Sequence, residues 1–344
     1  MNDIHISIID ESHGPEWDAY VRQHSHGTFF HLSKWRKIIE NALGHKTYFI
    51  QAQQDGKIVG ILPLGHIKSI LFGNSLVSTP FGVYGGILAD SEDVSASLEN
   101  HAVRLANQLG VDFLEFRNQG EPQAAWLAKD LYVTFKKDIS DDEDENMQAI
   151  PRKQRAMVRK GIKSGLHSVV ENTIDNFFRA YSESVRNLGT PVFPKQYFSA
   201  LLDAFGNDVD ILTVYSKDNQ LVASVMSFYF KDEVLPYYGG GTALARHLKG
   251  NDFMYWDLMR HAVAKGVRVF DYGRSKKGTG SYSFKKNWGF EPKDMGYSYK
   301  LIKSSEIPDI NPLNPKYQLF IKTWQKLPLG LANFIGPYIA RNLG

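Results

Sequence analysis

Cations, glycines and aromatic residues are concentrated between Phe270 and Phe290, in the sequence FDYGRSKKGTGSYSFKKNWGF. Such a composition suits a loop that binds an anionic ligand. Acyl transfer would add negative charge to a carbonyl oxygen, and a fixed cation near that oxygen would stabilise it. Lys285 and Arg274 are the candidates, with Lys285 as the main electrostatic group, and Asp271 is a candidate base or orienter of the acceptor. The alternative is an idle, solvated basic turn.

Two other chemistries are disfavoured in this segment. Gly273 to Thr279 approaches a phosphate-binding P-loop, but Thr279 stands where the required lysine should be. Gly278-Thr279-Gly280 lacks the third glycine and the following helix of a dinucleotide fingerprint, so we interpret it as a flexible turn. The chain also has no Gly-x-Ser-x-Gly elbow, which leaves a serine hydrolase with little support.

A second group of cations lies in PRKQRAMVRKGIKSGL, residues 151–166. A helix that begins after Pro151 would place four of them on one side, where they suit phosphate groups. These residues are Arg152, Arg155, Arg159 and Lys163. The alternative is a solvated helix face, neutralised by the acidic run at residues 141–145.

A third basic group, Arg246 and Lys249 with Gly250, precedes a helix-length segment. The amide groups and positive dipole end of that helix could bind phosphate. The alternative is that Asn251 simply caps the helix.

Composition limits the function classes. The 344 residues are 43% hydrophobic, enough for two domains of ordinary size. The chain has no cysteine, which excludes disulfides, thiolate zinc sites and a cysteine nucleophile. No histidine pair has metal-ligand spacing beside a carboxylate, so no metal is expected. With a net charge of +3, no signal peptide and no membrane span, we expect a cytoplasmic protein that does not bind DNA.

The elements that must position these groups occur twice. Residues 47–69 read as a hairpin that turns at Asp55-Gly56, and residues 210–230 read as a second hairpin that turns at residues 217–219. FGVYGGILAD at residues 81–90 then corresponds to LPYYGGGTALA at residues 235–245, each interpreted as a third strand that runs into a loop.

Each glycine cluster is followed by a predicted helix, residues 92–109 and 251–265, and then by a strand that starts at Gly110 or Gly266. Recurrence in one order indicates an internal duplication. The fold class is therefore α/β (α+β), and the order of the elements resembles the GNAT acetyltransferase fold, so we expect two tandem GNAT-like domains, each a mixed, mostly antiparallel sheet with flanking helices. The predicted parts are a first domain (1–140), an acidic linker and basic helix (141–165), a second domain with the transfer site (166–302) and a C-terminal extension (303–344).

The segments at residues 270–290 and 152–166, together with the duplicated fold, resemble the FemAB-like proteins. The likeness is greatest to the branch associated with exosortase and PEP-CTERM systems. The resemblance runs from about residue 31 to 292 and is sharpest from 271 to 288. It implies two GNAT-like domains and, in better understood relatives, transfer of an amino acid from aminoacyl-tRNA to the peptide of a peptidoglycan precursor. In those relatives a Phe-Lys pair serves the transfer centre, and Phe284-Lys285 looks like the match.

The predicted catalytic residues are therefore Lys285, Asp271 and Arg274. The residues predicted to bind substrate are Phe284, Lys286, Tyr282, Tyr238, Trp288, Arg246, Arg155 and Arg159. The glutamine- or arginine-led pyrophosphate loop of acetyl-CoA-dependent GNAT enzymes is only faintly echoed by residues 246–250, and the tryptophan-centred segment of the FemAB-like proteins only loosely by residues 33–36.

We thus expect an acyl or aminoacyl transferase that acts on a peptidoglycan- or exopolysaccharide-related envelope precursor. The expected donor is aminoacyl-tRNA or acyl-CoA, with no tightly bound cofactor, and the expected partners are a phosphorylated precursor or glycan and tRNA. A lipid-linked acceptor would favour loose attachment to the inner membrane surface. The alternatives are a CoA-dependent GNAT acyltransferase acting on a polysaccharide or small amine, and a non-catalytic binder of anionic glycan or RNA.

Overall fold

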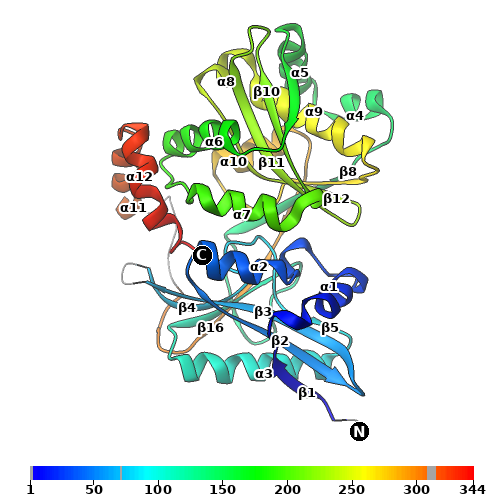
Figure 1. Ribbon diagram of the computed structural model, residues 1–344, viewed down its shortest axis with the longest axis vertical. Helices are drawn as coiled ribbons and strands as arrows, with labels where there is room; N and C mark the ends of the chain where they lie inside the picture. The colour runs from blue at the N-terminus through cyan, green and yellow to red at the C-terminus, as the bar shows by residue number, and fades with distance from the viewer. Residues whose placement is uncertain (1–2, 70–71, 308–314) are drawn as a thin grey trace. The chain divides into compact units, whose positions relative to one another are not determined.

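The computed structural model describes residues 3–69, 72–307 and 315–344, which form two compact units (Figure 1). Of these described residues, the first unit holds 3–132, 294–307 and 340–344. The second unit holds 133–293 and 315–339. Each unit contains one eight-stranded mixed sheet with helices on it, so two sheets form, as the duplicated pattern predicts.

The sheet of the first unit has the strand order β1-β2-β3-β4-β6-β16-β7, and β5 pairs with β3. Its strands are β1 (His5–Ile8), β2 (Lys46–Gln54), β3 (Lys57–Ser69), β4 (Gly73–Ser78), β5 (Leu88–Ala89), β6 (Phe113–Asn118), β7 (Leu127–Ala128) and β16 (Gly296–Leu301). Its helices are α1 (Gly14–Gln23), α2 (Lys34–Lys37) and α3 (Glu92–Leu109). β4 and β6 are parallel, whereas β2 and β3 form the predicted hairpin.

Helix α3 begins and ends where its sequence signals predict. The Ser91 hydroxyl accepts a hydrogen bond from the Val94 amide, and Gly110 follows the helix in the left-handed conformation. The buried side of the helix packs on the sheet at Gly60, where a Cβ atom would lie 2.6 Å from the Val94 side chain. The first core therefore forms between α3 and the β2-β3-β4-β6 part of the sheet.

The segment at residues 81–90 is not the predicted third strand. β4 provides that strand and ends at Ser78, because Thr79 and Phe81 have positive φ angles of 44° and 65°. The Gly85 amide then donates to the Arg117 carbonyl, and a Cβ on Gly85 would lie only 2.4 Å from the Ser78 carbonyl. The glycine pair is thus a close crossing over β4 and β6, and only Leu88–Ala89 is strand.

The sheet of the second unit has the order β14-β8-β13-β12-β11-β10-β9, and β15 pairs with β8. Its strands are β8 (Tyr132–Asp138), β9 (His167–Glu171), β10 (Val209–Tyr215), β11 (Leu221–Phe230), β12 (Glu233–Gly241), β13 (Val269–Asp271), β14 (Ser275–Lys276) and β15 (Pro292–Asp294). Its helices are α4 (Glu143–Ala149), α5 (Arg152–Lys163), α6 (Asp175–Leu188), α7 (Lys195–Phe205), α8 (Ala243–Leu248), α9 (Gly250–Ala264), α10 (Gly280–Asn287), α11 (Pro315–Trp324) and α12 (Leu329–Ala340).

The observed units differ from the predicted domain boundaries at 140 and 302. β8 belongs to the second sheet, where it pairs with β13 in register Val269–Asp138. β16 belongs to the first sheet, where it pairs with β6 in register Gly296–Asn118. Each sheet therefore contains a strand from the other half of the sequence. The backbone hydrogen bonds of a strand, and not its place in the sequence, decide which sheet it joins.

The segment at residues 271–288 is not a continuous loop, and the turn at residues 278–280 does lead into a helix. The Thr279 hydroxyl accepts a hydrogen bond from the Tyr282 amide and caps α10. Helix α10 then carries the residues Phe284, Lys285 and Lys286. Across the described residues, no helix is long and apolar enough to cross a bilayer.

Candidate active site

The sheet of the second unit opens between β12 and β13. The two strands pair in parallel only at Glu233–Val269 and Val234–Phe270. Among the described strands, residues 235–241 of β12 pair with β11 alone. The pairing of β11 with β12 also contains a bulge: Met226 faces Tyr238 and Ser227 faces Pro236, so that Tyr237 is an extra residue in β12. A bulge beside a strand edge is a common way to expose backbone groups to a ligand. A carbonyl group could therefore pair with β12 in this opening.

A cavity of about 470 Å³ lies at the glycine end of β12. It is bounded by the end of that strand, by α8 and the start of α9, by the side of α6, and by one residue each from α5 and α10. The lining residues are Met157, Ser184, Asn187, Leu188, Gly241, Thr242, Ala245, Arg246, Lys249, Asn251, Asp252 and Phe284. We call this cavity the donor pocket, because its size and basic turn could accommodate a phosphate-bearing donor.

The turn into α9 gives the donor pocket its cations. Lys249 adopts a left-handed conformation, φ 60° and ψ 38°, and caps a helix that starts at Gly250. Asn251 is therefore not the cap that the sequence suggested, since it already lies in the first turn. Glycine would have little steric cost at these angles, whereas a lysine pays that cost and adds a positive charge at the helix start. Arg246, one turn earlier on α8, lines the same pocket.

Asp252 is a pocket residue that sequence reasoning missed. Its carboxylate accepts hydrogen bonds from the Gln154 amide and, at 3.3 Å, from Trp288 Nε1. Burial raises the pKa of Asp252. Trp288 is itself fully buried, so it supports the pocket through Asp252 instead of lining it. The sequence did contain a signal for Asp252, since it is an acidic residue in the first turn of a helix that follows the basic residues Arg246 and Lys249.

Lys285 is buried inside the second unit. Its Nζ donates to three backbone carbonyls, those of Tyr272 at 2.7 Å, Gly273 at 3.1 Å and Arg274 at 2.9 Å. An ammonium group has three protons, and this cage uses all of them. The geometry therefore supports a role in holding residues 272–274, and contact with a transferred group stays a prediction. Lys286, the next residue, is exposed.

Asp271 lies in a buried group of charges. Its side chain is 2% exposed, and Oδ1 accepts from the Gly273 amide at 2.6 Å while Oδ2 lies 3.4 Å from Lys136 Nζ. Lys136 also contacts Glu233 Oε2 at 2.8 Å. These contacts hold the carboxylate in place, which supports a role in orienting the turn at residues 271–274 more than a role in proton exchange with a substrate.

The predicted aromatic residues separate into two groups. Tyr238 is buried, and its hydroxyl lies 2.8 Å from the Tyr197 hydroxyl within a cluster of rings from α6 and α7. Tyr282 packs edge-on against Phe135 in the core. Phe284 alone of the predicted aromatic residues lines the donor pocket. The structure therefore brings Phe284 together with Arg246 and leaves Tyr238 in the core.

The basic stripe predicted at residues 152–163 forms on α5. A groove of about 490 Å³ runs along this helix and is lined by Arg152, Arg155, Ala156, Arg159, Lys160 and Lys163. Arg155 Nε also donates to the Ile150 carbonyl at 3.2 Å, which fixes the start of the helix. We call this surface the basic groove. Helix α5 packs on α9, the helix that opens at the donor pocket.

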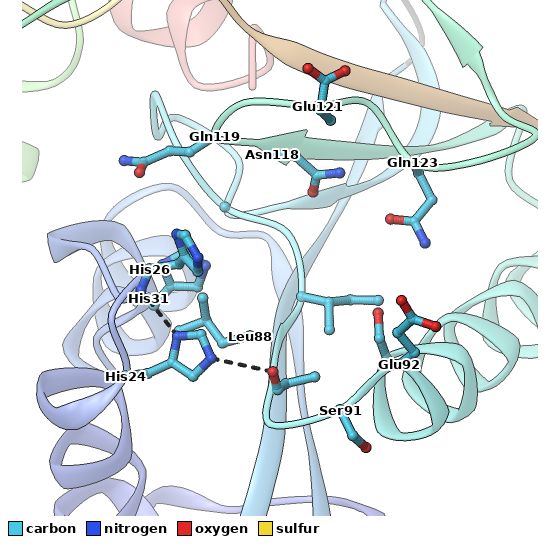
Figure 2. Close-up of a pocket in the computed structure, with 14 residues that line it drawn as sticks. His24, His26, His31, Leu88, Ser91, Glu92, Asn118, Gln119, Glu121 and Gln123 are labelled. Carbon is cyan, nitrogen blue, oxygen red and sulfur yellow. Dashed lines mark hydrogen bonds between the residues drawn. The ribbon is translucent and has the colours of Figure 1, made fainter.

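The first unit contains a pocket of different chemistry. Figure 2 shows imidazole rings on one side and amide and carboxylate groups on the other, around a cavity of about 500 Å³. The polar residues are His24, His26, His31, Ser91, Glu92, Ser95, Asn118, Gln119, Glu121 and Gln123. We call it the histidine pocket. Ser91 caps the start of α3 and Glu92 adds a negative charge there, so this helix end disfavours a phosphate group.

Close packing fixes one wall of the histidine pocket. Gly86 has a φ angle of 92°, and a Cβ there would lie 2.1 Å from the Asn118 side-chain oxygen. His24 Nε2 lies 3.4 Å from the Ala89 carbonyl on the opposite side. Within the described residues, no group of three or more His, Asp and Glu side chains is arranged to hold a metal ion.

The buried amine of Lys285 should make stability depend on pH. Burial lowers its pKa from the ordinary 10.5 to about 7, so the folded state loses this proton before the unfolded state does. Stability from this group is fully present above about pH 10.5 and is lost as pH falls towards 7. We expect the unfolding free energy to rise by up to ~1.4 kcal/mol per pH unit within this window. Denaturant titrations at several pH values check this, and an equal slope in Lys285→Met would contradict it.

Comparison with known proteins agrees with this architecture. Residues 152–286 match a family described as Acetyltransferase (GNAT) domain. This match confirms the expected acyltransferase class for that part of the chain. Over 221 residues the chain is 22% identical to the lipid II:glycine glycyltransferase of Staphylococcus aureus (strain COL), covering 57% of this chain and 51% of the relative. The chain thus spans about half the length of this curated relative.

Two solved structures share the fold. FemX matches with a TM-score of 0.67 and 15% identity, covering 92% of this chain and 100% of FemX. The tandem GNAT protein from the clavulanic acid biosynthesis pathway matches with a TM-score of 0.53 and 11% identity, covering 88% of this chain and 100% of that protein. The predicted fold of two tandem GNAT-like domains is therefore confirmed.

Proposed function

We propose that this protein transfers an aminoacyl group from a phosphate-bearing donor to an amine of a peptidoglycan-related envelope precursor. The observation that carries the proposal is the open edge of β12 above a donor pocket with Arg246 and Lys249 at its basic turn. The similarity to a lipid II:glycine glycyltransferase supports the aminoacyl group and the precursor. The similarity to FemX supports the same class through its fold.

The charges of the second unit support a polyanionic donor. Arg246 and Lys249 line the donor pocket, and the basic groove on α5 adds further cations. A donor with several successive phosphates, such as the acceptor end of a tRNA, would use both surfaces, whereas a CoA pyrophosphate needs only a short basic turn. The length of the basic groove therefore favours aminoacyl-tRNA, and acyl-CoA remains the second candidate because the matched family is one of acetyltransferases.

The histidine pocket supports a place for the acceptor. Its amides, imidazoles and two glutamates suit a ligand with hydroxyl, amide and amine groups, and Glu92 repels phosphate. The envelope precursors that the sequence suggests contain sugar and peptide groups of this kind. We assign the polar part of the acceptor to this pocket.

The transfer step requires attack of the acceptor amine on the ester or thioester carbonyl of the donor. The amine nitrogen bonds to the carbonyl carbon, the bond to the tRNA oxygen or CoA sulfur breaks, and a proton passes from the nitrogen to the leaving group. Backbone amides at the open edge of β12 would stabilise the carbonyl oxygen. Lys285 and Asp271 would act by holding residues 271–274, and Phe284 would contact the donor.

The donor class is tested in two separate reactions of the full chain with a peptidoglycan precursor. One contains radiolabelled glycyl-tRNA and the other contains radiolabelled acetyl-CoA. We expect label in the precursor from glycyl-tRNA only. Label from acetyl-CoA alone would replace the aminoacyl assignment by the CoA-dependent one. Binding of RNA or glycan with steep salt dependence, and no transfer from either donor, would identify a non-catalytic binder instead.

Two finer assignments stay with this proposal. The resemblance in residues 271–288 supports the exosortase and PEP-CTERM branch, in which an exopolysaccharide-related acceptor would replace the peptide. The expected location is the cytoplasmic side of the inner membrane. Transfer to an exopolysaccharide intermediate, with no transfer to a peptidoglycan precursor, would select that branch.

A further inference from the structure

Helix α12 has an unusual distribution of side-chain sizes. Its inner side carries small residues, and Gly336 lies so close to the segment after α6 that a Cβ would come 3.0 Å from the Val192 amide. Its outer side carries large apolar residues, with Phe334 70% and Tyr338 60% exposed. A surface helix usually buries its large apolar residues. This helix presents them to the surroundings.

Helix α11 also exposes large apolar residues, although its inner side carries large ones as well. Leu319 is 73% exposed, whereas Trp324 is buried and stacks on Phe320 with ring centroids 5.4 Å apart. The helix is fixed to the end of α6, because Ile321 packs on Gly189 and the Gln325 carbonyl accepts from Arg186. α12 rests on the same helix through Asn333, whose amide donates to the Ser182 hydroxyl at 3.3 Å. Both helices are thus held on α6 with apolar side chains outward.

We call the exposed apolar residues of this region the apolar patch. Its members are Leu188, Leu319, Phe320, Leu331, Phe334 and Tyr338. Soluble proteins rarely expose so many large apolar side chains on two consecutive helices unless that surface binds something.

The charges within residues 315–344 have one sign. All 37 aspartate and glutamate residues of the chain precede residue 315, although residues 315–344 contain four lysines and arginines. Lys322, Lys326 and Arg341 are exposed in this segment, and Arg186 lies against it. A segment that exposes apolar side chains and cations, and that contains no acid, complements an anionic lipid surface.

We propose that α11 and α12 dock the protein on an anionic lipid bilayer by inserting the apolar patch among the headgroups. The two short helices would lie in the interface, consistent with the absence of a spanning helix among the described residues. Leu188 belongs both to the apolar patch and to the lining of the donor pocket. Docking would therefore bring that pocket to the level of a lipid-linked substrate. The proposal rests on this surface and does not require the proposed transfer.

Flotation of the full chain with vesicles tests the docking without any substrate. We expect binding to phosphatidylcholine vesicles that contain about one third phosphatidylglycerol, and at least about tenfold weaker binding to phosphatidylcholine alone. Added salt should weaken the binding, because the headgroup attraction is screened. Failure of the wild-type chain to float with the anionic vesicles would overturn the proposal, whatever the outcome of the transfer assay.

Matched variants locate the surface. Leu319→Ser with Phe334→Ser should reduce vesicle binding at least about tenfold, since two inserted apolar side chains are lost. Val169→Ser removes an exposed aliphatic residue, 47% exposed, from the edge strand β9 of the same unit and should leave binding unchanged. Lys322→Glu with Lys326→Glu should abolish the preference for anionic vesicles. A double serine variant that floats like the wild type, or one that instead dissolves a dimer of this chain, would refute lipid docking.

Discussion

At about pH 10.5, where burial of the amine costs little free energy, replacing Lys285 with methionine lowers the free energy of unfolding by about 3 kcal/mol, because the carbonyls of residues 272–274 lose their buried donor. Methionine has a similar length and fills the same space, so the loss is one of hydrogen bonds more than of volume. The transfer rate falls by about 100-fold, because residues 271–274, at the end of β13 beside the open part of the sheet, shift when Lys285 no longer holds them. Denaturant unfolding and single-turnover transfer measure the two effects.

Lys286→Met is the control, because Lys286 is the next residue of α10 and is exposed. It should change stability by less than about 0.5 kcal/mol. Hydrogen exchange of the amides at residues 272–276 separates positioning from direct catalysis. If Lys285→Met lost transfer while those amides kept their protection and the protein kept its stability, Lys285 would act on the substrate itself.

Reversing two charges of the basic groove weakens donor binding by about 100-fold at low salt. Arg159→Glu with Lys163→Glu replaces two exposed cations of α5 by anions and so repels the phosphates of the donor. The logarithmic dependence of affinity on salt should also become shallower by about one unit for each lost phosphate contact. Filter binding of charged tRNA over a salt series measures both quantities.

Lys153→Glu is the matched control for that experiment. Lys153 is an exposed residue of the same helix but does not line the basic groove. This single reversal changes the net charge by two units, against four in the double variant, and should weaken binding by much less than half as much on the logarithmic scale. A loss of half the size on that scale would mean that the net charge of the unit, and not the groove, governs binding. An unchanged affinity in the double variant would exclude the groove from the donor site.

The repeated elements were predictable because their signals are local. Asp55-Gly56 sets the first hairpin turn, and Ser91 and Gly110 bound α3. The helix at residues 280–287 also had a local signal, since threonine at position 279 is a good cap, but the flanking glycines favoured a loop. The basic stripe on α5 followed directly from residue spacing.

The surroundings of individual site residues were not predictable in this way. Lys285 looks like a solvent-exposed cation in the sequence, and only the fold of residues 272–274 around it buries the amine. Tyr238 follows an aromatic residue in a glycine-rich strand, yet packing with α6 and α7 places it in the core. Asp252 was overlooked because its partners, Gln154 and Trp288, are far away in sequence.

The exchange of strands between the two sheets constrains how the chain can fold during synthesis. β16 lies between β6 and β7 in the first sheet, although its residues, 296–301, come after all the strands of the second sheet in the sequence. The first unit therefore cannot close its sheet while the ribosome is still making the second, and β6 waits with an unpaired edge. Expression of either half alone should yield an incomplete sheet that aggregates. A nascent chain of this kind would depend on chaperones until its last strand emerges.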